Sequence, residues 1–291
     1  MGSYSPPPPP REEGTGYRGT EPQILPPGTV YMPPQPVRRQ RRSWMVAPAT
    51  YSLMGINFAV FLWMVLGHVS YLSPSPDDLL VFGANNAGAV LINDQWWRIV
   101  TAMFVHVGII HLATNMWCLW NLGMLAEPLM GSLGVFAVYI LTGAAGNLLS
   151  VFVTRAWFYD PSQVSGGLFG PVGAGASGAV FGIAGALIVL LKSHWLPIPP
   201  GELSKLRRSV IYFAGINLVI GLATVIPGSF VKIDNMAHMG GCACGLLFAA
   251  PMVPGIGAPK KLFFFRRRIA IGLVVLTLTL FAFFIASFQG Q

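Results

Sequence analysis

The sequence contains few charged residues: Asp, Glu, Lys and Arg make up 10% of the 291 residues, whereas hydrophobic types make up 54%. An average soluble protein carries about 25% charged residues, and a chain of this size cannot bury so much apolar surface in one soluble core. The apolar residues also form runs close to the roughly 20 residues that a membrane-spanning helix needs. The scarcity of charge therefore excludes an ordinary soluble domain and predicts an all-α membrane protein.

Cysteine is also scarce, and Cys118, Cys242 and Cys244 all lie within apolar stretches. This placement predicts no disulfide framework. The first 45 residues hold no apolar core, so we expect no cleavable signal peptide. The net charge of +8 comes from short basic clusters between apolar segments, which favours contact with lipid headgroups over contact with nucleic acid.

Residues 1–43 differ in composition from the rest of the chain. They are rich in proline, glycine and charge and include an uninterrupted proline run, Pro6–Pro10. Such a segment lacks the apolar residues that would offset the entropy cost of ordering it, so we predict a disordered cytoplasmic tail. A docking site for a proline-binding module is a second interpretation.

The remainder of the chain contains seven apolar segments, each of which we expect to form a membrane helix. Their approximate bounds are Ala49–Val69, Gly108–Ala126, Gly134–Val153, Ser177–Leu191, Val210–Ile226, Asn235–Val253 and Ile269–Phe288. Residues 44–254 then form a six-helix core, and residues 255–291 contribute a basic cytoplasmic loop and a seventh helix.

Basic residues predict the orientation of these helices, because cytoplasmic loops carry an excess of Lys and Arg. If the helices alternate in direction, three clusters fall on one side: Arg38–Arg42, Lys192–Arg208 and Lys260–Arg268. The N-terminus is then cytoplasmic and the C-terminus outside. We expect a bacterial plasma membrane, with an organelle as the alternative, and the oligomeric state stays open.

Few polar residues lie within the apolar segments, and such residues are functional candidates by default. A helix rise of about 1.5 Å per residue places Ser177 about 22 Å above the inner boundary. The same rise places His238 and His111 at about 24 Å. The hydrocarbon core is roughly 30 Å thick, so we expect these side chains at one depth near the outer face. Asn115 lies one turn deeper than His111 on the same helical face.

A hydroxyl, an imidazole and two side-chain donors at one depth predict acyl-transfer chemistry. Serine becomes an effective nucleophile when a base takes its proton, and histidine suits that role. We therefore interpret Ser177 as the nucleophile and His238 as its base. His111, Asn115 and the Ser177 backbone amide can donate hydrogen bonds to the oxyanion of a tetrahedral intermediate. The alternative is structural hydrogen bonding within or between helices.

Small residues flank the predicted nucleophile and base. Gly178 and Gly182 follow the serine, and Gly241 and Gly245 follow the histidine. Each pair has the small-xxx-small spacing that lets membrane helices approach closely. The spacing is common in simple packing contacts, but here it predicts that the two helices carrying the site touch. We also predict that the loop Pro227–Asp234 caps a water-filled cavity over the site.

Four short motifs, in order along the chain, resemble those of the rhomboid family. They are Trp97-Arg98, His111-Leu112-Ala113-Thr114-Asn115, Gly175-Ala176-Ser177-Gly178 and Ala237-His238-Met239-Gly240-Gly241. Glu127 is similar to a glutamate that usually follows the second helix of that family. The resemblance covers about Ala49–Pro254, and the seventh segment fits the 6+1 arrangement of many members.

The resemblance implies an intramembrane serine endopeptidase that cleaves single-pass transmembrane proteins near the outer face. It implies a dyad of Ser177 and His238 without a third acidic member, and an oxyanion site of His111, Asn115 and the Ser177 amide. It implies no metal and no organic cofactor. Phe181 departs from some bacterial members, in which a tyrosine packs against the base. We expect the ring packing to be kept.

Other polar residues are expected to be structural. His106 should contact a loop, and Glu127 should fix the inner loop. Trp97 and Arg98 should anchor the first outer loop at the membrane interface. The histidines lack an HExxH pattern and a nearby carboxylate pair, which argues against a zinc site.

Two other function classes compete with proteolysis. A catalytically inactive relative that binds membrane clients would usually lack the serine or the histidine, and this chain has both. A transporter would show internal repeats or helices broken near the membrane centre, whereas the polar cluster lies toward the outer face. Transmembrane protein substrates and the lipid bilayer are therefore the expected partners, with no nucleic acid.

Overall fold

The computed structural model describes residues 47–193, 196, 198–223, 233–255 and 259–287. The regular elements in these ranges are helices, and the only strand-like pairings there are two isolated bridges. The predicted disordered tail and its Arg38–Arg42 cluster lie outside the described residues, as does most of the loop Pro227–Asp234.

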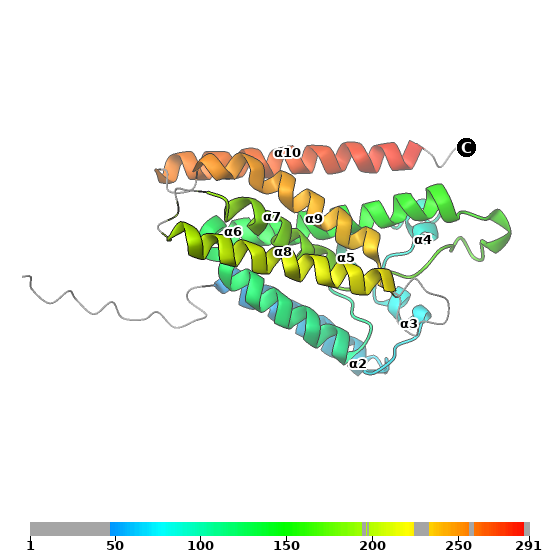
Figure 1. The fold of residues 1–291 in the computed structure, drawn as a ribbon. Coiled ribbons are helices and arrows are strands. Elements are labelled where there is room, and N and C mark those ends of the chain that lie inside the picture. The colour runs from blue at the N-terminus through cyan, green and yellow to red at the C-terminus, as the bar shows by residue number, and fades with distance from the viewer. Residues whose placement is uncertain (1–46, 194–195, 197, 224–232, 256–258, 288–291) are drawn as a thin grey trace, which may run out of the picture. The chain divides into compact units, whose positions relative to one another are not determined.

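The helices follow the chain in the order shown in Figure 1. Their bounds are α2 (Pro48–Leu66), α3 (Pro76–Val81), α4 (Ala87–Leu91), α5 (Arg98–Thr101), α6 (Ile109–Phe158), η1 (Pro161–Gln163), α7 (Ser177–Leu190), α8 (Pro200–Ala223), α9 (Asn235–Ala249), η2 (Ala250–Gly255) and α10 (Lys260–Ser287). Within the described ranges, α2, α6, α9 with its 3-10 extension, and α10 are long and apolar enough to cross a membrane. The fold class predicted from composition, an all-α membrane protein, is confirmed.

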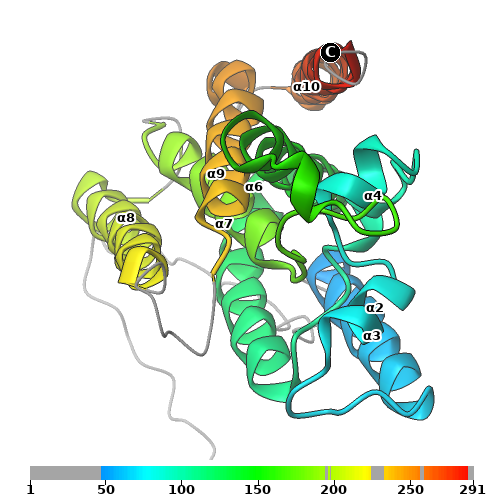
Figure 2. The same cartoon turned by 90° about the vertical axis from the view of Figure 1, so that its right-hand side faces the viewer.

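The second and third predicted segments form one element, α6, that is broken in the middle. Gly131 has a φ of 73°, outside the helical region, and Pro128 lies one turn earlier. Proline removes a backbone donor and glycine tolerates a positive φ, so the two together turn the chain without a long loop. The first half of α6 runs beside α2 in Figures 1 and 2.

Glu127 joins α6 to the start of α2. Its carboxylate accepts hydrogen bonds from the backbone amides of Ala49 and Thr50, at 2.8 and 2.9 Å, and from the Thr50 hydroxyl at 2.8 Å. A carboxylate at the N-terminus of a helix satisfies free amides and complements the helix dipole. The prediction that Glu127 fixes an inner loop was therefore wrong about what this residue binds. Its carboxylate caps the N-terminus of α2 instead.

Two predicted loops are shorter than expected because their basic residues are helical. Lys205, Arg207 and Arg208 belong to α8, which begins ten residues before the predicted Val210, and the basic residues of Lys260–Arg268 begin α10. Long basic side chains can continue an apolar helix beyond the hydrocarbon because their charged ends reach toward the headgroups.

The segment between α2 and α6 contains three short helices, α3 to α5, and Arg98 at the start of α5 ties that helix to the end of α3 and the residues after it. The Arg98 side chain is buried, and its guanidinium donates to the carbonyls of Leu80 and Ala84 at 2.7 and 2.9 Å. Trp97 is half exposed beside it. The half-exposed Trp97 ring has the exposure expected of an interfacial anchor. The buried Arg98 side chain instead holds the loop by hydrogen bonds to carbonyls inside it.

Candidate active site

Close glycine contacts bring α7 and α9 together where the predicted site residues lie. A β-carbon on Gly241 would overlap the carbonyl of Gly178, and a β-carbon on Gly245 would overlap that of Gly182. One placed on Gly178 would lie 3.3 Å from the carbonyl oxygen of Ala237. The small-xxx-small pairs therefore meet each other across one seam, as their spacing predicted.

Ser177 is the first residue of α7, and His238 is the fourth residue of α9. The residue after Ser177 contacts Ala237, which immediately precedes His238. The seam thus brings together the chain segments that carry the predicted nucleophile and base. Within the described ranges no hydrogen bond joins their side chains, and such bonds are often long in the absence of substrate.

The imidazole of His238 packs against an aromatic ring. Phe181, one turn after Ser177, stacks on it with ring centroids 4.2 Å apart and planes 11° apart. Phenylalanine therefore keeps the ring packing that the sequence led us to expect. The Nδ1 atom of His238 is buried and has no hydrogen-bond partner among the described residues.

The loop before Ser177 is held by two hydrogen bonds with the segment between α2 and α6. The Gly175 amide donates to the Ala102 carbonyl at 2.9 Å, and the Ala176 amide lies 3.4 Å from Nε2 of His106. On the other side of that ring, Nδ1 of His106 lies 3.2 Å from the Phe104 carbonyl. The ring must therefore donate from Nδ1 and accept at Nε2, which is the neutral form.

Burial keeps His106 neutral. It lowers the pKa of the imidazole to about 3, helped by the nearby charge of His111. The sequence placed His106 in a loop contact, and the structure shows which loop it is. His106 holds the residue directly before Ser177, a link between positions 70 residues apart that no local pattern could indicate.

His111 lies against the same loop. Gly175 has a φ of 127°, and a β-carbon there would lie 2.6 Å from Cε1 of His111. The Val107 amide donates to Nδ1 of His111 at 3.3 Å, so the ring proton resides on Nε2. That nitrogen, which would lie 3.0 Å from the same added β-carbon, is thereby a donor at the turn leading into Ser177.

Asn115 lies one turn further along α6, as its spacing predicted. Its Nδ2 donates to the His111 carbonyl at 2.9 Å, and the side chain is buried. An amide nitrogen has two protons, so this bond leaves the second one for another acceptor. Two oxyanion candidates therefore sit on consecutive turns of one helix.

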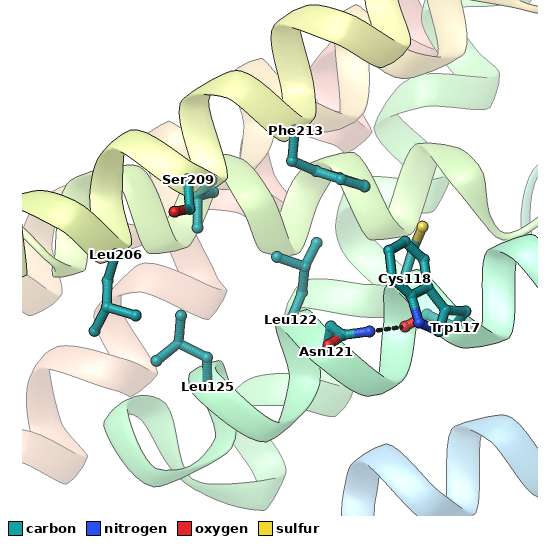
Figure 3. A pocket seen from close by; sticks show the side chains of 9 residues that line it. Trp117, Cys118, Asn121, Leu122, Leu125, Leu206, Ser209 and Phe213 are labelled. Carbon is teal, nitrogen blue, oxygen red and sulfur yellow. Dashed lines mark hydrogen bonds between the residues drawn. The ribbon is translucent and has the colours of Figure 1, made fainter.

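An apolar groove lies between the first half of α6 and α8 (Figure 3). Its lining residues are Trp117, Cys118, Asn121, Leu122, Leu125, Leu206, Ser209, Val210 and Phe213. Phe213 also faces Phe181, with ring centroids 6.2 Å apart. The groove therefore leads toward the ring that packs on His238.

Residues 93–255 match the sequence model of the Rhomboid domain. This match spans more than half of the chain and includes every residue of the site described above. The chain belongs to the rhomboid family.

Several rhomboid relatives are similar over most of this chain. It is 30% identical to rhomboid protease GluP of Bacillus subtilis over 78% of its length, but spans 38% of that protein. It is 31% identical to rhomboid protease AarA of Providencia stuartii, covering 73% of this chain and 74% of AarA. It is 33% identical to the mitochondrial RHOMBOID-like protein 6 of Arabidopsis thaliana, over 64% of this chain and 53% of that relative. GluP and AarA are both named rhomboid proteases.

Proposed function

We propose that this rhomboid protein is an active serine endopeptidase that hydrolyses peptide bonds of single-pass transmembrane proteins. The observation that carries the proposal is the glycine-lined seam that brings the start of α7, with Ser177, against the first turn of α9, with His238. His238 removes the proton of the Ser177 hydroxyl as it attacks the scissile carbonyl, and returns the proton to the leaving amine.

The oxyanion formed in that attack is stabilised by His111, Asn115 and the backbone amide of Ser177. The tautomer of His111 supports this role, because Nδ1 accepts from Val107 and leaves the proton on Nε2. The Ser177 amide lies at the first position of α7, where helical amides have no partner within the helix. Donors arranged before the reaction lower its barrier without reorganisation.

The groove between α6 and α8 is the proposed docking surface for the substrate helix. Its lining is almost wholly apolar, which matches a transmembrane segment, and Phe213 links it to the Phe181 ring on His238. The proposed catalytic core is residues 44–254, with the seventh helix as an addition to it.

We further propose that cleavage occurs near the outer face of a bacterial plasma membrane. Basic residues at the start of α8 and α10 support a cytoplasmic position for those helix ends, and Ser177 would then lie near the opposite face. The N-terminus is then cytoplasmic and the C-terminus outside. A catalytically inactive client-binding protein is the competing function, and the presence of both Ser177 and His238 disfavours it.

The test compares purified wild-type protein with Ser177→Ala in lipid vesicles that contain a panel of single-pass membrane proteins. The wild type should release fragments cut near the outer face, and Ser177→Ala should release none. Ser52→Ala, which removes an exposed hydroxyl on α2, is the matched control and should cleave normally. Equal fragment release by Ser177→Ala and the wild type would refute the proposal.

A further inference from the structure

One carboxylate, that of Asp234, joins the start of α9 to α6. Asp234 is the N-cap of α9, and its Oδ1 accepts from the Ala237 amide at 2.9 Å. Its Oδ2 accepts from the hydroxyl of Ser150 at 2.5 Å. Ser150 is buried in the second half of α6. A cap requires only the first of these bonds, so the second adds a link between helices.

A third segment passes beside the same carboxylate. A β-carbon on Gly173 would lie 3.4 Å from Oδ2 of Asp234, in van der Waals contact. Gly173 lies in the loop that leads to Ser177, and its backbone exchanges two hydrogen bonds with Asn85, at 2.7 and 2.8 Å. The Asp234 carboxylate therefore lies where α6, the start of α9 and the loop leading to Ser177 come together.

The packing between α6 and α9 is also a close contact of one backbone with another. A β-carbon on Gly146 would overlap the Ala237 carbonyl, and one on Gly240 would lie 3.0 Å from the Gly146 α-carbon. Glycine contacts of this kind let two helix backbones approach closely. The hydrogen bond between Ser150 and Asp234 adds a directional side-chain link between the same two segments.

Packing and the first turn of α9 position the His238 ring. No hydrogen bond reaches its Nδ1 atom within the described residues, and Phe181 stacks on one face of the ring. The His238 amide donates to the Asp234 carbonyl at 3.2 Å, so the capping residue and the base share the first turn of α9. A displacement of about 1 Å in a catalytic group can cost about 100-fold in rate.

We propose that Asp234 and Ser150 form a clamp that sets the position of His238 relative to Ser177. Asp234 acts as a positioning residue through the first turn of α9 and makes no contact with substrate. This inference rests on the proposed proteolytic function, because a displaced base matters only where His238 accepts a proton from Ser177.

The test measures kcat, KM and the midpoint of thermal unfolding for full-length variants in lipid vesicles. Asp234→Ala removes both links and should lower kcat about tenfold or more with little change in KM. Asp234→Asn should recover most of kcat, because its oxygen still accepts from Ala237 and its amide can donate to Ser150. Ser150→Ala should lower kcat, but add little to Asp234→Ala, because both changes break one interaction.

The chain offers a matched control in a second Asp–Ser pair. Asp160 caps the 3-10 helix η1, and its Oδ1 accepts from the Ser162 amide at 2.9 Å and hydroxyl at 2.7 Å. This pair lies in an exposed loop away from both catalytic segments. Asp160→Ala and Ser162→Ala should leave kcat at the wild-type value.

The outcomes separate the clamp from the proposed function. If Asp234→Ala lowers the unfolding midpoint but leaves kcat unchanged, the pair is only structural and the clamp is refuted. It is equally refuted if Asp234→Asn is as slow as Asp234→Ala, or if the effects of Ser150→Ala and Asp234→Ala add fully. Wild-type protein and Ser177→Ala run beside them, and cleavage that does not depend on Ser177 would instead overturn the proposed function.

Discussion

The seam between α7 and α9 and the groove between α6 and α8 differ in how they are packed. In the seam, glycines bring one backbone against another, with no room for even a methyl group. In the groove, large apolar side chains line an open space. Figure 2 shows α7 near the middle of the bundle and α8 at its edge. The proposed catalytic groups thus lie beside a tightly packed contact, whereas the proposed docking surface is an open groove.

The largest expected effect comes from filling the seam. Gly245→Ala places a methyl group on the Gly182 carbonyl, and overpacking of this kind costs typically 1–3 kcal/mol. We expect loss of cleavage and a lower unfolding midpoint. Gly272→Ala in α10 is the control, because a β-carbon there meets nothing within 4 Å. A Gly245→Ala protein with normal cleavage would show that the close approach is dispensable.

A smaller loss is expected from Asn115→Ala, which keeps the seam intact and removes one oxyanion donor. The rate constant kcat should fall about 10²- to 10³-fold with a nearly unchanged unfolding midpoint. Asn217→Ala provides the control, since Asn217 on α8 bonds to the carbonyl four residues earlier at 2.8 Å, in the same way that Asn115 does. Equal kcat values for the two variants would contradict the assigned oxyanion site.

Removing the aromatic ring of Phe181, which stacks on His238, should lower kcat moderately. Phe181→Leu keeps the apolar volume but loses the stack, which is worth about 0.5–1.5 kcal/mol, so kcat should fall by up to about tenfold. Phe181→Tyr retains the ring and should stay close to the wild type. If leucine and tyrosine at this position gave the same kcat, the stack would have no part in holding the base.

The smallest expected effect comes from substituting a residue that lines the groove between α6 and α8. Leu206→Ala removes apolar surface from the groove lining, near the start of α8. KM should therefore rise by up to about tenfold while kcat stays unchanged. Ile211→Ala, on the same helix but outside this groove, serves as the control. A fall in kcat without a rise in KM would show that the groove affects the chemistry rather than substrate docking.

The long apolar segments and the approach of the glycine-bearing helices followed from the sequence, because both depend on spacings within one helix. The pairing of Ser177 with His238 is a prediction from the depth and spacing of polar residues, and the packing of Phe181 was expected from the family resemblance. The distant partners of Glu127, His106 and Asp234 could not be predicted. Each binds a segment at least 70 residues away in sequence, and a local pattern cannot specify which distant amide or hydroxyl a side chain will meet.

The helix ends show a second reason for the difference. Basic residues mark where a chain leaves the hydrocarbon, but they do not end a helix, so α8 begins at Pro200 rather than near Val210. The turn within α6 was expected as a loop between two segments. Its compact form depends on the positive φ of Gly131, which only the folded chain reveals.

The most direct test of the account is to identify by mass spectrometry the residue that a serine-directed fluorophosphonate probe modifies in membranes. The account predicts that Ser177 carries the probe in the wild type, and that His238→Ala abolishes the modification because the hydroxyl loses its base. Modification of another residue, or modification of Ser177 at the wild-type rate in His238→Ala, would contradict it.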